Sequence, residues 1–188
     1  MSRKRQEAPG RLELVREFVN TLDLEDDEEE LATPKQLDSW LRGHDLLDRG
    51  AKVGEGDVER AHEVREALRA LLKENNGFDR EVGTIETLHA AADRADIALT
   101  FDPEGSTLAP TAPGVDGALG RLLTIVHEAE HDGTWKRLKA CPWHTCYYAF
   151  YDNTKNASGV WCTMEVCGNR AKAKAYRERQ ARSVHEAH

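Results

Sequence analysis

The sequence predicts a mainly helical protein of the α+β class, in which a helical N-terminal domain with a small β-hairpin precedes a compact cysteine-rich module. Three observations support this prediction. Apolar residues recur every three or four positions in several stretches between residues 11 and 126, as on one face of a helix. A short stretch near residue 100 alternates instead, as strands do. All four cysteines lie within 27 residues of the C-terminal quarter.

The expected boundaries follow the changes in composition. Residues 1–10 are polar and end in Pro9-Gly10, so we expect a disordered tail there. We expect the N-terminal domain to occupy 11–134, the cysteine-rich module 135–182, and a second tail 183–188.

The first predicted helix begins at Arg11, and its apolar positions share one face: Leu12, Val15, Phe18, Val19 and Leu22. Seven carboxylates around Leu24 then fill the run from Asp23 to Glu30. Such a run is usually a self-repelling, solvated loop, with calcium binding as the alternative.

Thr33 is the expected N-cap of the next helix, with Pro34 at its first position. Leu37, Trp40 and Leu41 of this helix should point inward. The clearest helix spans 57–75, and Asn75-Asn76-Gly77 provides its C-terminal stop.

The rest of the N-terminal domain is predicted as a helical stretch, a hairpin and a last helix. The helical stretch carries Val82, Ile85, Leu88 and Ala92. The hairpin pairs the alternating residues 97–101 with 107–109 across a turn at 102–105. The last helix places five apolar residues on one side: Val115, Leu119, Leu122, Leu123 and Val126.

The cysteines form two pairs, Cys141 with Cys146 and Cys162 with Cys167. Four residues separate the members of each pair, and fifteen lie between the pairs. Two short loops that each supply two thiolates are typical of a structural zinc site. His144 is the alternative to Cys146 as fourth ligand, because it follows Cys141 in C-x-x-H spacing. No secretory signal is evident, so we expect a reducing, cytoplasmic setting in which metal is favoured over disulfides.

Charge is divided unevenly along the chain. Residues 1–134 hold 16 Lys and Arg against 30 Asp and Glu, a net charge of −14, whereas residues 135–188 hold 10 against 4, a net charge of +6. A polyanion would therefore meet the C-terminal module. No apolar run is long enough for a membrane-spanning helix, so we expect no membrane partner.

A helix that Thr163 could cap should contain Cys167 and reach about Gln180. A cysteine knuckle followed by a ligand in the first turn of a helix resembles a treble clef, so the module is predicted to be a treble-clef-like zinc finger. The basic residues on this helix are candidates for contacts with DNA: Arg170, Lys172, Lys174, Arg177 and Arg179. The alternative is a solvated helix, or one docked on the acidic domain.

His127-Glu128-Ala129-Glu130-His131 matches the H-E-x-x-H pattern of zinc proteases. We nevertheless expect no enzyme, and a metallohydrolase is only the remote alternative. The histidines lie well away from the apolar stripe of their helix and would face solvent. The helix also ends almost at once, at Asp132-Gly133.

Cys167-Gly168-Asn169-Arg170, preceded by Trp161-Cys162-Thr163-Met164 and by Phe150-Tyr151-Asp152, resembles the CGNR zinc finger. In that family the finger usually follows an N-terminal ABATE domain, and Phe18-Val19-Asn20-Thr21 and Thr33-Pro34 are similar to that domain. The sequence departs from the family at Val160, where members often carry a basic residue.

The resemblance implies a stress-induced transcriptional regulator that binds DNA through the finger, with one structural zinc ion. It also implies that the N-terminal domain senses a signal or a small ligand, for which Asn20 and Thr21 are the candidate residues; facing water is their alternative role. A protein-interaction adaptor that does not bind DNA is the competing function. Because a single finger offers few contacts, we expect a symmetric homodimer through the helical domain.

Overall fold

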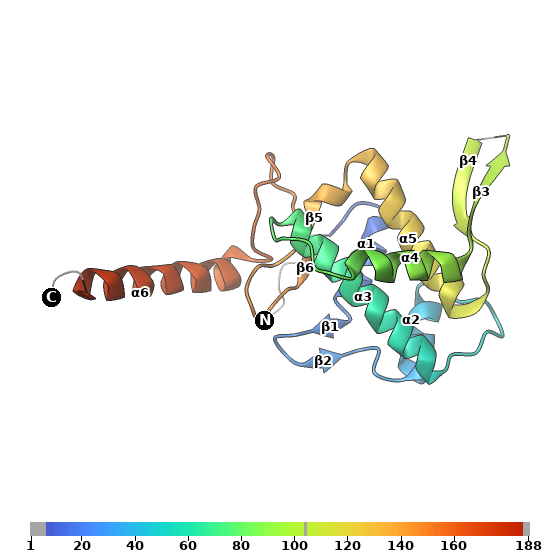
Figure 1. Ribbon diagram of the computed structural model, residues 1–188, viewed down its shortest axis with the longest axis horizontal. Coiled ribbons are helices and arrows are strands. Elements are labelled where there is room, and N and C mark those ends of the chain that lie inside the picture. Colours follow the sequence, from blue (N-terminus) through green and yellow to red (C-terminus); the bar gives the residue numbers. More distant parts are fainter. Residues whose placement is uncertain (1–6, 104, 186–188) are drawn as a thin grey trace.

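Six α-helices account for most of the computed structural model, which describes residues 7–103 and 105–185 (Figure 1). They are α1 (Leu12–Val19), α2 (Pro34–Gly43), α3 (Glu55–Asn75), α4 (Thr84–Ala95), α5 (Gly114–Asp132) and α6 (Asn169–His185). A 3-10 turn, η1 (Trp135–Arg137), follows α5, and a π-helical turn, η2 (Met164–Gly168), leads into α6.

The strands form three antiparallel pairs within the described residues. They are β1 (Leu22–Asp23) with β2 (Glu28–Glu29), β3 (Ile97–Asp102) with β4 (Gly105–Pro110), and β5 (Leu138–Ala140) with β6 (Ala149–Tyr151). The predicted mainly helical α+β class is confirmed.

Helix α3 lies at the centre of the body, where α1, α2, α4 and α5 all contact it. Val64, Leu68 and Leu72 are fully buried and stand four residues apart, which places them on one face of the helix. The core that they form continues into the cysteine-rich module, because Leu138 of β5 and Ala149 of β6 belong to it. The module is therefore packed on the body through its first strand pair.

Most of the local signals in the sequence act as expected. The Thr33 hydroxyl accepts a hydrogen bond from the amide of Gln36 at 3.3 Å, and Pro34 is the first residue of α2. Strands β3 and β4 pair from Ile97 with Pro110 to Asp102 with Gly105, and this hairpin projects from the body (Figure 1).

Val82 differs from its prediction. We placed it in the helical stretch, but α4 begins at Thr84 and Val82 is exposed. Gly83 explains the later start, because its φ of +84° is a left-handed conformation that an α-helix does not include.

The acidic run from Asp23 to Glu30 forms a short hairpin, not the self-repelling loop that we predicted. Arg65 of α3 is buried beneath it and holds Glu29 with two hydrogen bonds of 2.7 Å each. Burial alone would raise the pKa of Glu29, but these hydrogen bonds lower it. The repulsion within the run is thus offset by a cation that is distant in sequence.

The predicted tails are shorter than expected where the structure describes them. Ala8 is buried, and its amide donates to Glu13 at 2.7 Å, so this residue of the predicted tail rests on the body. Helix α6 continues to His185, past the start of the predicted tail at 183. Residues 1–6 and 186–188 lie outside the described residues. No helix among the described ones is long and apolar enough to cross a membrane.

Candidate metal centre and nucleic-acid interface

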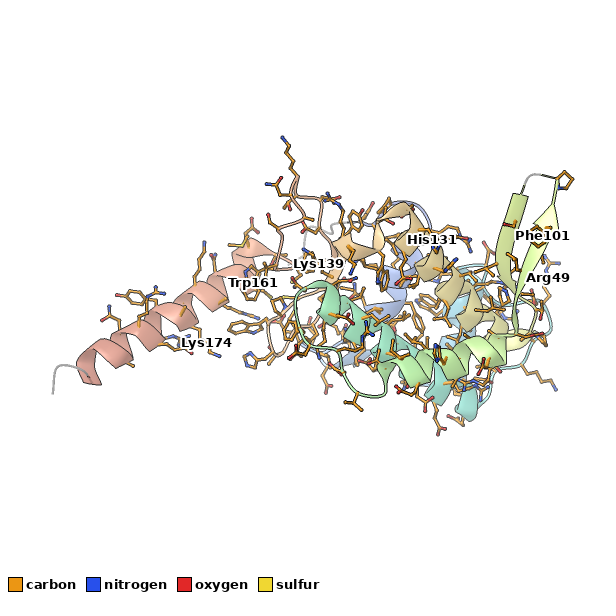
Figure 2. The ribbon with its side chains drawn as sticks, turned by 45° about the horizontal axis from the view of Figure 1, so that its top comes forward. Arg49, Phe101, His131, Lys139, Trp161 and Lys174 are labelled. Carbon is orange, nitrogen blue, oxygen red and sulfur yellow. The ribbon has the colours of Figure 1, made fainter. Side chains whose placement is uncertain are left out.

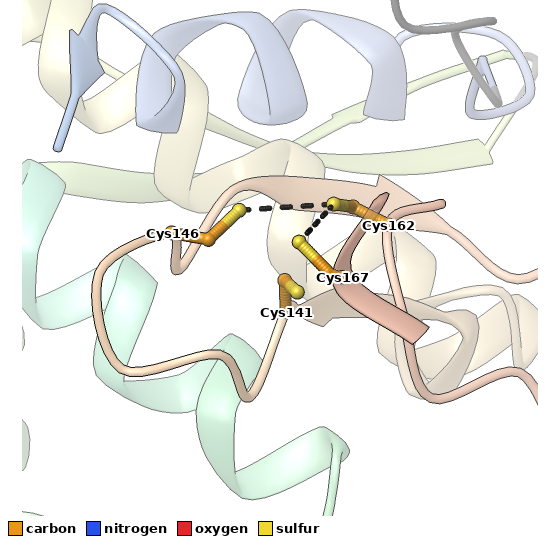
Figure 3. A group of neighbouring side chains, drawn as sticks. All are labelled: Cys141, Cys146, Cys162 and Cys167. Atoms are coloured by element: carbon orange, nitrogen blue, oxygen red, sulfur yellow. Dashed lines mark hydrogen bonds between the residues drawn. The ribbon is translucent and has the colours of Figure 1, made fainter. Parts of the chain in front are cut away.

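The four cysteines gather in one buried cluster (Figure 3). Cys141 directly follows β5, Cys146 lies just before β6, Cys162 precedes η2 and Cys167 lies within it. Their sulfur atoms all lie within 4.8 Å of one another. The first loop is closed by a 3.0 Å hydrogen bond from the amide of Cys141 to the carbonyl of Tyr148.

The cluster has the dimensions of a tetrahedral zinc site. Four thiolates bound at about 2.3 Å to one zinc ion would stand about 3.8 Å apart. The Sγ atom of Cys162 lies 3.7 Å from that of Cys146 and 3.6 Å from that of Cys167. Disulfide sulfurs would be about 2.0 Å apart, and all four cysteines are free. The residues therefore fit one structural zinc ion.

Crowding of the four thiols explains why the cluster needs a cation. Hydrogen bonds with Cys146 and Cys162 lower the pKa of Cys141 to about 2. Burial raises the pKa of Cys167 to about 12, and hydrogen bonds with Cys141 and Cys146 raise that of Cys162. One thiolate is thus favoured at the expense of the others, and a divalent ion would supply the charge that lets all four ionise.

The histidines that we considered as metal ligands lie elsewhere. His144 is exposed, with its ring centroid 4.9 Å from that of Trp143. His127 and His131 are also exposed, and His131 Nδ1 lies 2.9 Å from the carbonyl oxygen of His127. Among the described residues, the four cysteines are the only group of three or more side chains that could hold a metal ion.

The turn that carries Cys167 is tightly packed. A Cβ atom on Gly168 would lie 2.6 Å from Met164 Sδ and 3.3 Å from the ring of Trp161, so any larger residue there would displace the end of the Met164 side chain. Thr163 stands at the expected N-cap position, but its hydroxyl makes no capping bond and is buried without a partner among the described residues. Its carbonyl instead accepts from the amide of Gly168 at 3.1 Å, which produces the π-helical turn.

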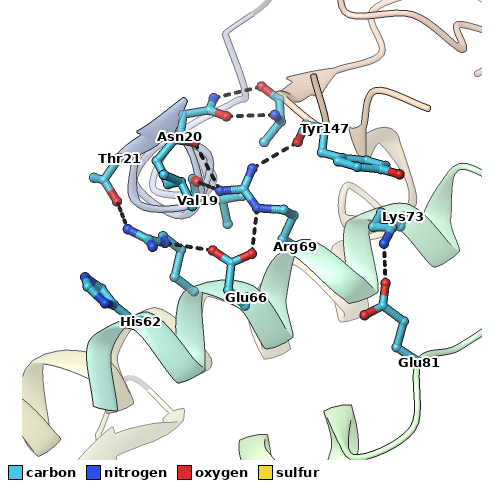
Figure 4. A network of polar contacts seen from close by, with 12 residues as sticks. Val19, Asn20, Thr21, His62, Glu66, Arg69, Lys73, Glu81 and Tyr147 are labelled. Atoms are coloured by element: carbon cyan, nitrogen blue, oxygen red, sulfur yellow. Dashed lines mark hydrogen bonds and ion pairs between the residues drawn. The ribbon is translucent and has the colours of Figure 1, made fainter. Parts of the chain in front are cut away.

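Polar side chains of the body bind the backbone of the cysteine-rich module, and we call them the docking residues: Asn20, Arg69, Asn75 and Asn76. Asn20 makes two hydrogen bonds to one residue of β6, because its Nδ2 donates to the Ala149 carbonyl at 2.9 Å and its Oδ1 accepts from the Ala149 amide at 2.7 Å (Figure 4). Arg69 Nη1 donates to the Tyr147 carbonyl at 3.0 Å.

The end of α3 completes this attachment. Asn75 donates to the carbonyls of Trp135 and Leu138, each at 3.0 Å. Asn76 donates to those of Ala140 and Val160, each at 2.8 Å. The sequence suggested only a helix stop for these asparagines, since nothing local indicates partners sixty or more residues away.

Asn20 and Thr21, the candidate ligand-sensing pair, both have structural partners. Thr21 is buried, donates to the carbonyl of Phe18 at 2.8 Å and accepts from Arg65 at 3.2 Å. Asn20 is half-buried and borders a cavity while it holds Ala149. A sensing role for the pair stays a prediction.

Lys139 and Asp152 form a buried ion pair beside the metal centre. Lys139 Nζ lies 2.8 Å from Asp152 Oδ2 and also donates to the carbonyls of Ala157 and Gly159. Burial by itself would raise the pKa of Asp152, but hydrogen bonds from Lys139 and Thr154 lower it to about 2. The pair holds the loop between β6 and Cys162 in place.

Helix α6 projects away from the body, and Lys174 lies on it far from Phe101 of the hairpin (Figures 1 and 2). The five candidate DNA-binding residues are all exposed: Arg170, Lys172, Lys174, Arg177 and Arg179. Arg170 makes an ion pair with Glu25 of the acidic hairpin. Asn169 Nδ2 donates to the Glu165 carbonyl at 3.1 Å and so stabilises the helix start.

Two family models match the chain. The ABATE model, described as "Putative stress-induced transcription regulator", matches residues 12–131. The CGNR zinc finger model matches residues 137–180. The two occur in the order that the sequence resemblance implied. No curated protein matches the chain in a sequence search.

Proposed function

The chain belongs to the ABATE family and carries a CGNR zinc finger, and from this premise we propose that it regulates transcription by binding duplex DNA through α6. The observation that carries the proposal is a basic helix that stands clear of an acidic body. A helix of 17 residues is about 25 Å long, and the DNA major groove is wide enough to admit it.

The position of α6 supports this proposal on electrostatic grounds. The N-terminal 134 residues carry a net charge of −14 and would repel a duplex within a Debye length of about 8–10 Å. A helix that extends away from the body brings its cations to the phosphates while much of the acidic surface stays at a distance (Figure 1). A zinc ion bound to Cys167 would fix η2, the turn that leads into that helix.

Salt dependence of binding to labelled duplex DNA tests the proposal. The zinc-loaded chain should bind at low salt, and log K should fall linearly with log salt at about 0.9 per phosphate contacted. Fluorescence anisotropy measures both quantities. If no duplex in a mixed-sequence pool binds at low salt, the proposed function is wrong.

A protein-interaction adaptor is the second candidate, and two exposed apolar side chains favour it. Tyr176 on α6 is 58% exposed and Met164 in η2 is 50% exposed. An apolar partner surface would give weak salt dependence, so the same titration series with a protein partner separates the two functions. We propose no catalytic activity for either function.

We also propose that two chains act together as a symmetric dimer through the body, because paired half-sites multiply the affinity of weak single modules. Leu99 and Phe101 support this, since both are exposed on β3, at 55% and 78%. Light scattering during chromatography tests it, and a strict monomer at tens of micromolar with and without DNA would rule it out. We further propose that the ABATE domain senses a signal or a small ligand.

A further inference from the structure

A cavity of about 250 Å³ lies where the body meets the zinc finger. Helix α1 and its C-cap contribute Arg16, Glu17 and Asn20, and α2 and its C-cap contribute Trp40 and His44. Tyr148 reaches the cavity from the finger, where it lies two residues after Cys146. The cavity therefore joins the proposed sensing domain to the metal centre.

The charged groups of the lining favour a positively charged ligand. Arg16 is 2% exposed, and its guanidinium donates through Nε to Glu13 at 2.8 Å and through Nη2 to the other oxygen of that carboxylate. Its charge is therefore offset by Glu13. Two further carboxylates line the cavity, on Glu17 and Glu30.

His44 does not reverse this balance. Its Nε2 lies 3.4 Å from Glu17 Oε2, and its Nδ1 lies 2.7 Å from the carbonyl of Trp40. With His44 neutral the lining keeps two uncompensated carboxylates, and with His44 protonated it keeps one. The lining is negative in both states, which attracts cations and repels anions.

Aromatic rings supply the other half of a cation site. Trp40 is half-buried and held in place, because its ring centroid lies 4.1 Å from that of His44 and 5.4 Å from that of Phe18. Tyr148 is half-buried on the finger side. Aromatic faces attract ammonium groups, most strongly when water is excluded, and a Trp face is the best of them.

We propose that this cavity binds a small organic cation, a primary or quaternary ammonium compound of metabolite size, between Trp40, Tyr148 and the carboxylates of Glu17 and Glu30. A second hollow of about 500 Å³ is also lined by Trp40 and Glu30. The inference deepens the proposed sensing role of the body and rests on it for its regulatory meaning.

Binding in the cavity would reach the finger by two direct routes. The backbone of Tyr148 accepts a hydrogen bond from the Cys141 amide, so a ligand on the Tyr148 ring contacts a residue bonded to a metal ligand. Asn20, which borders the cavity, holds both backbone groups of Ala149. A ligand therefore biases the position of the strand that leads from Cys146.

Choline and its uncharged isostere 3,3-dimethyl-1-butanol are matched probes for the test. Each is titrated into the zinc-loaded full chain without DNA, and nuclear magnetic resonance follows the Trp40 indole and the Ala149 amide. Choline should shift both signals to saturation at millimolar concentration, and the alcohol should bind about tenfold more weakly. Because DNA is absent, the outcome is independent of DNA binding.

A pair of double variants locates the site. Glu17→Gln with Glu30→Gln removes both carboxylates from the lining and should weaken choline binding about tenfold. Glu59→Gln with Glu86→Gln removes the same charge from exposed positions on α3 and α4, and this control should leave the affinity for choline unchanged. Equal binding of choline and the alcohol, or preferred binding of the anion 3,3-dimethylbutanoate, overturns the proposal. A saturating shift of Trp40 without a shift of Ala149 overturns the coupling to the finger.

Discussion

The two halves of the zinc finger differ in how they meet the rest of the molecule. The first half, β5 and β6, shares the core of the body and is held by the docking residues Asn20, Arg69, Asn75 and Asn76. The second half is η2 with α6, and α6 projects into solvent and chiefly contacts η2, the turn before it (Figure 1). The first half attaches the finger to the body, and we call it the supporting half. The second half is exposed to a partner, and we call it the projecting half.

This division makes the metal centre the joint between the halves. Cys141 and Cys146 belong to the supporting half, and Cys162 and Cys167 belong to the projecting half. A zinc ion bound to all four is thus the main link that fixes the direction of α6. Small zinc modules derive most of their folding free energy from the metal, but here β5 and β6 also belong to the main core of the body.

Loss of the metal should have the largest effect and should separate the halves. Cys162→Ser removes one of the four ligands of an ion whose total binding free energy in structural sites is about 10–16 kcal/mol. We expect η2 and α6 to unfold while β5, β6 and the body stay folded, because the latter share the main core. Zinc content and amide hydrogen exchange measure this, and chelation of zinc should reproduce it. Equal loss of protection in α3 would show that the halves are one unit.

Breaking the buried ion pair should have the next largest effect, and on stability alone. Asp152→Ala leaves Lys139 buried and unpaired, which should cost about 3–5 kcal/mol in the free energy of unfolding. The double variant Lys139→Met with Asp152→Leu should recover much of this. Denaturant titration measures both, and a loss under 1 kcal/mol in the single variant, about the size of a surface pair, would contradict the expectation.

The same pair predicts a pH dependence. The pKa of Asp152 is lowered to about 2 in the folded protein, against about 3.9 for an unfolded Asp. The stability that its carboxylate contributes should be complete above the unfolded value and should disappear as the pH falls toward 2. Asp152→Asn should lack this part of the acid dependence when thermal melts are compared from pH 5 to pH 2.

Removal of charge from the projecting half should affect DNA binding and not folding. Lys172→Ala, Lys174→Ala and Arg177→Ala together should lower the slope of log K against log salt by about 3, if each contacts one phosphate. Lys35→Ala, Arg49→Ala and Lys52→Ala remove the same charge from exposed positions of the body and should leave the slope unchanged. Equal changes in the two triple variants would mean that only net charge matters.

Sequence periodicity predicted the parts of the molecule that local interactions determine. The helices, the β3–β4 hairpin and the zinc cluster follow from apolar spacing, turn residues and cysteine spacing. Asn20, Asn75 and Asn76 could not be assigned their partners, because each donates to backbone carbonyls sixty or more residues away. Every residue has a backbone carbonyl, so the residue type of the acceptor gives no indication in the sequence of which asparagine binds it.

The prediction of a solvated loop for the acidic run was wrong for a related reason. The charge run from Asp23 to Glu30 indicates repulsion locally, and its compensation comes from Arg65, which is 36 residues away from Glu29. Arg65 is 2% exposed in the folded chain, although it is a charged residue of a helix. Its burial depends on how α3 packs against the segment after α1, which is a property of the tertiary arrangement.

The smallest expected effect concerns the one ion pair described between the acidic hairpin and the basic helix. Arg170 forms an ion pair with Glu25, and the two side chains are 44% and 18% exposed. The Glu25 carboxylate therefore competes with DNA phosphates for the Arg170 guanidinium. Glu25→Gln should therefore raise DNA affinity by at most about fivefold, as expected for a partly exposed pair. Glu28→Gln removes the same charge from an exposed neighbour in the hairpin and isolates the general electrostatic effect. In an Arg170→Ala background the two variants should become equal, because the direct competition is gone. An advantage of Glu25→Gln that persists without Arg170 would show that Glu25 does not act by competing with DNA for that arginine.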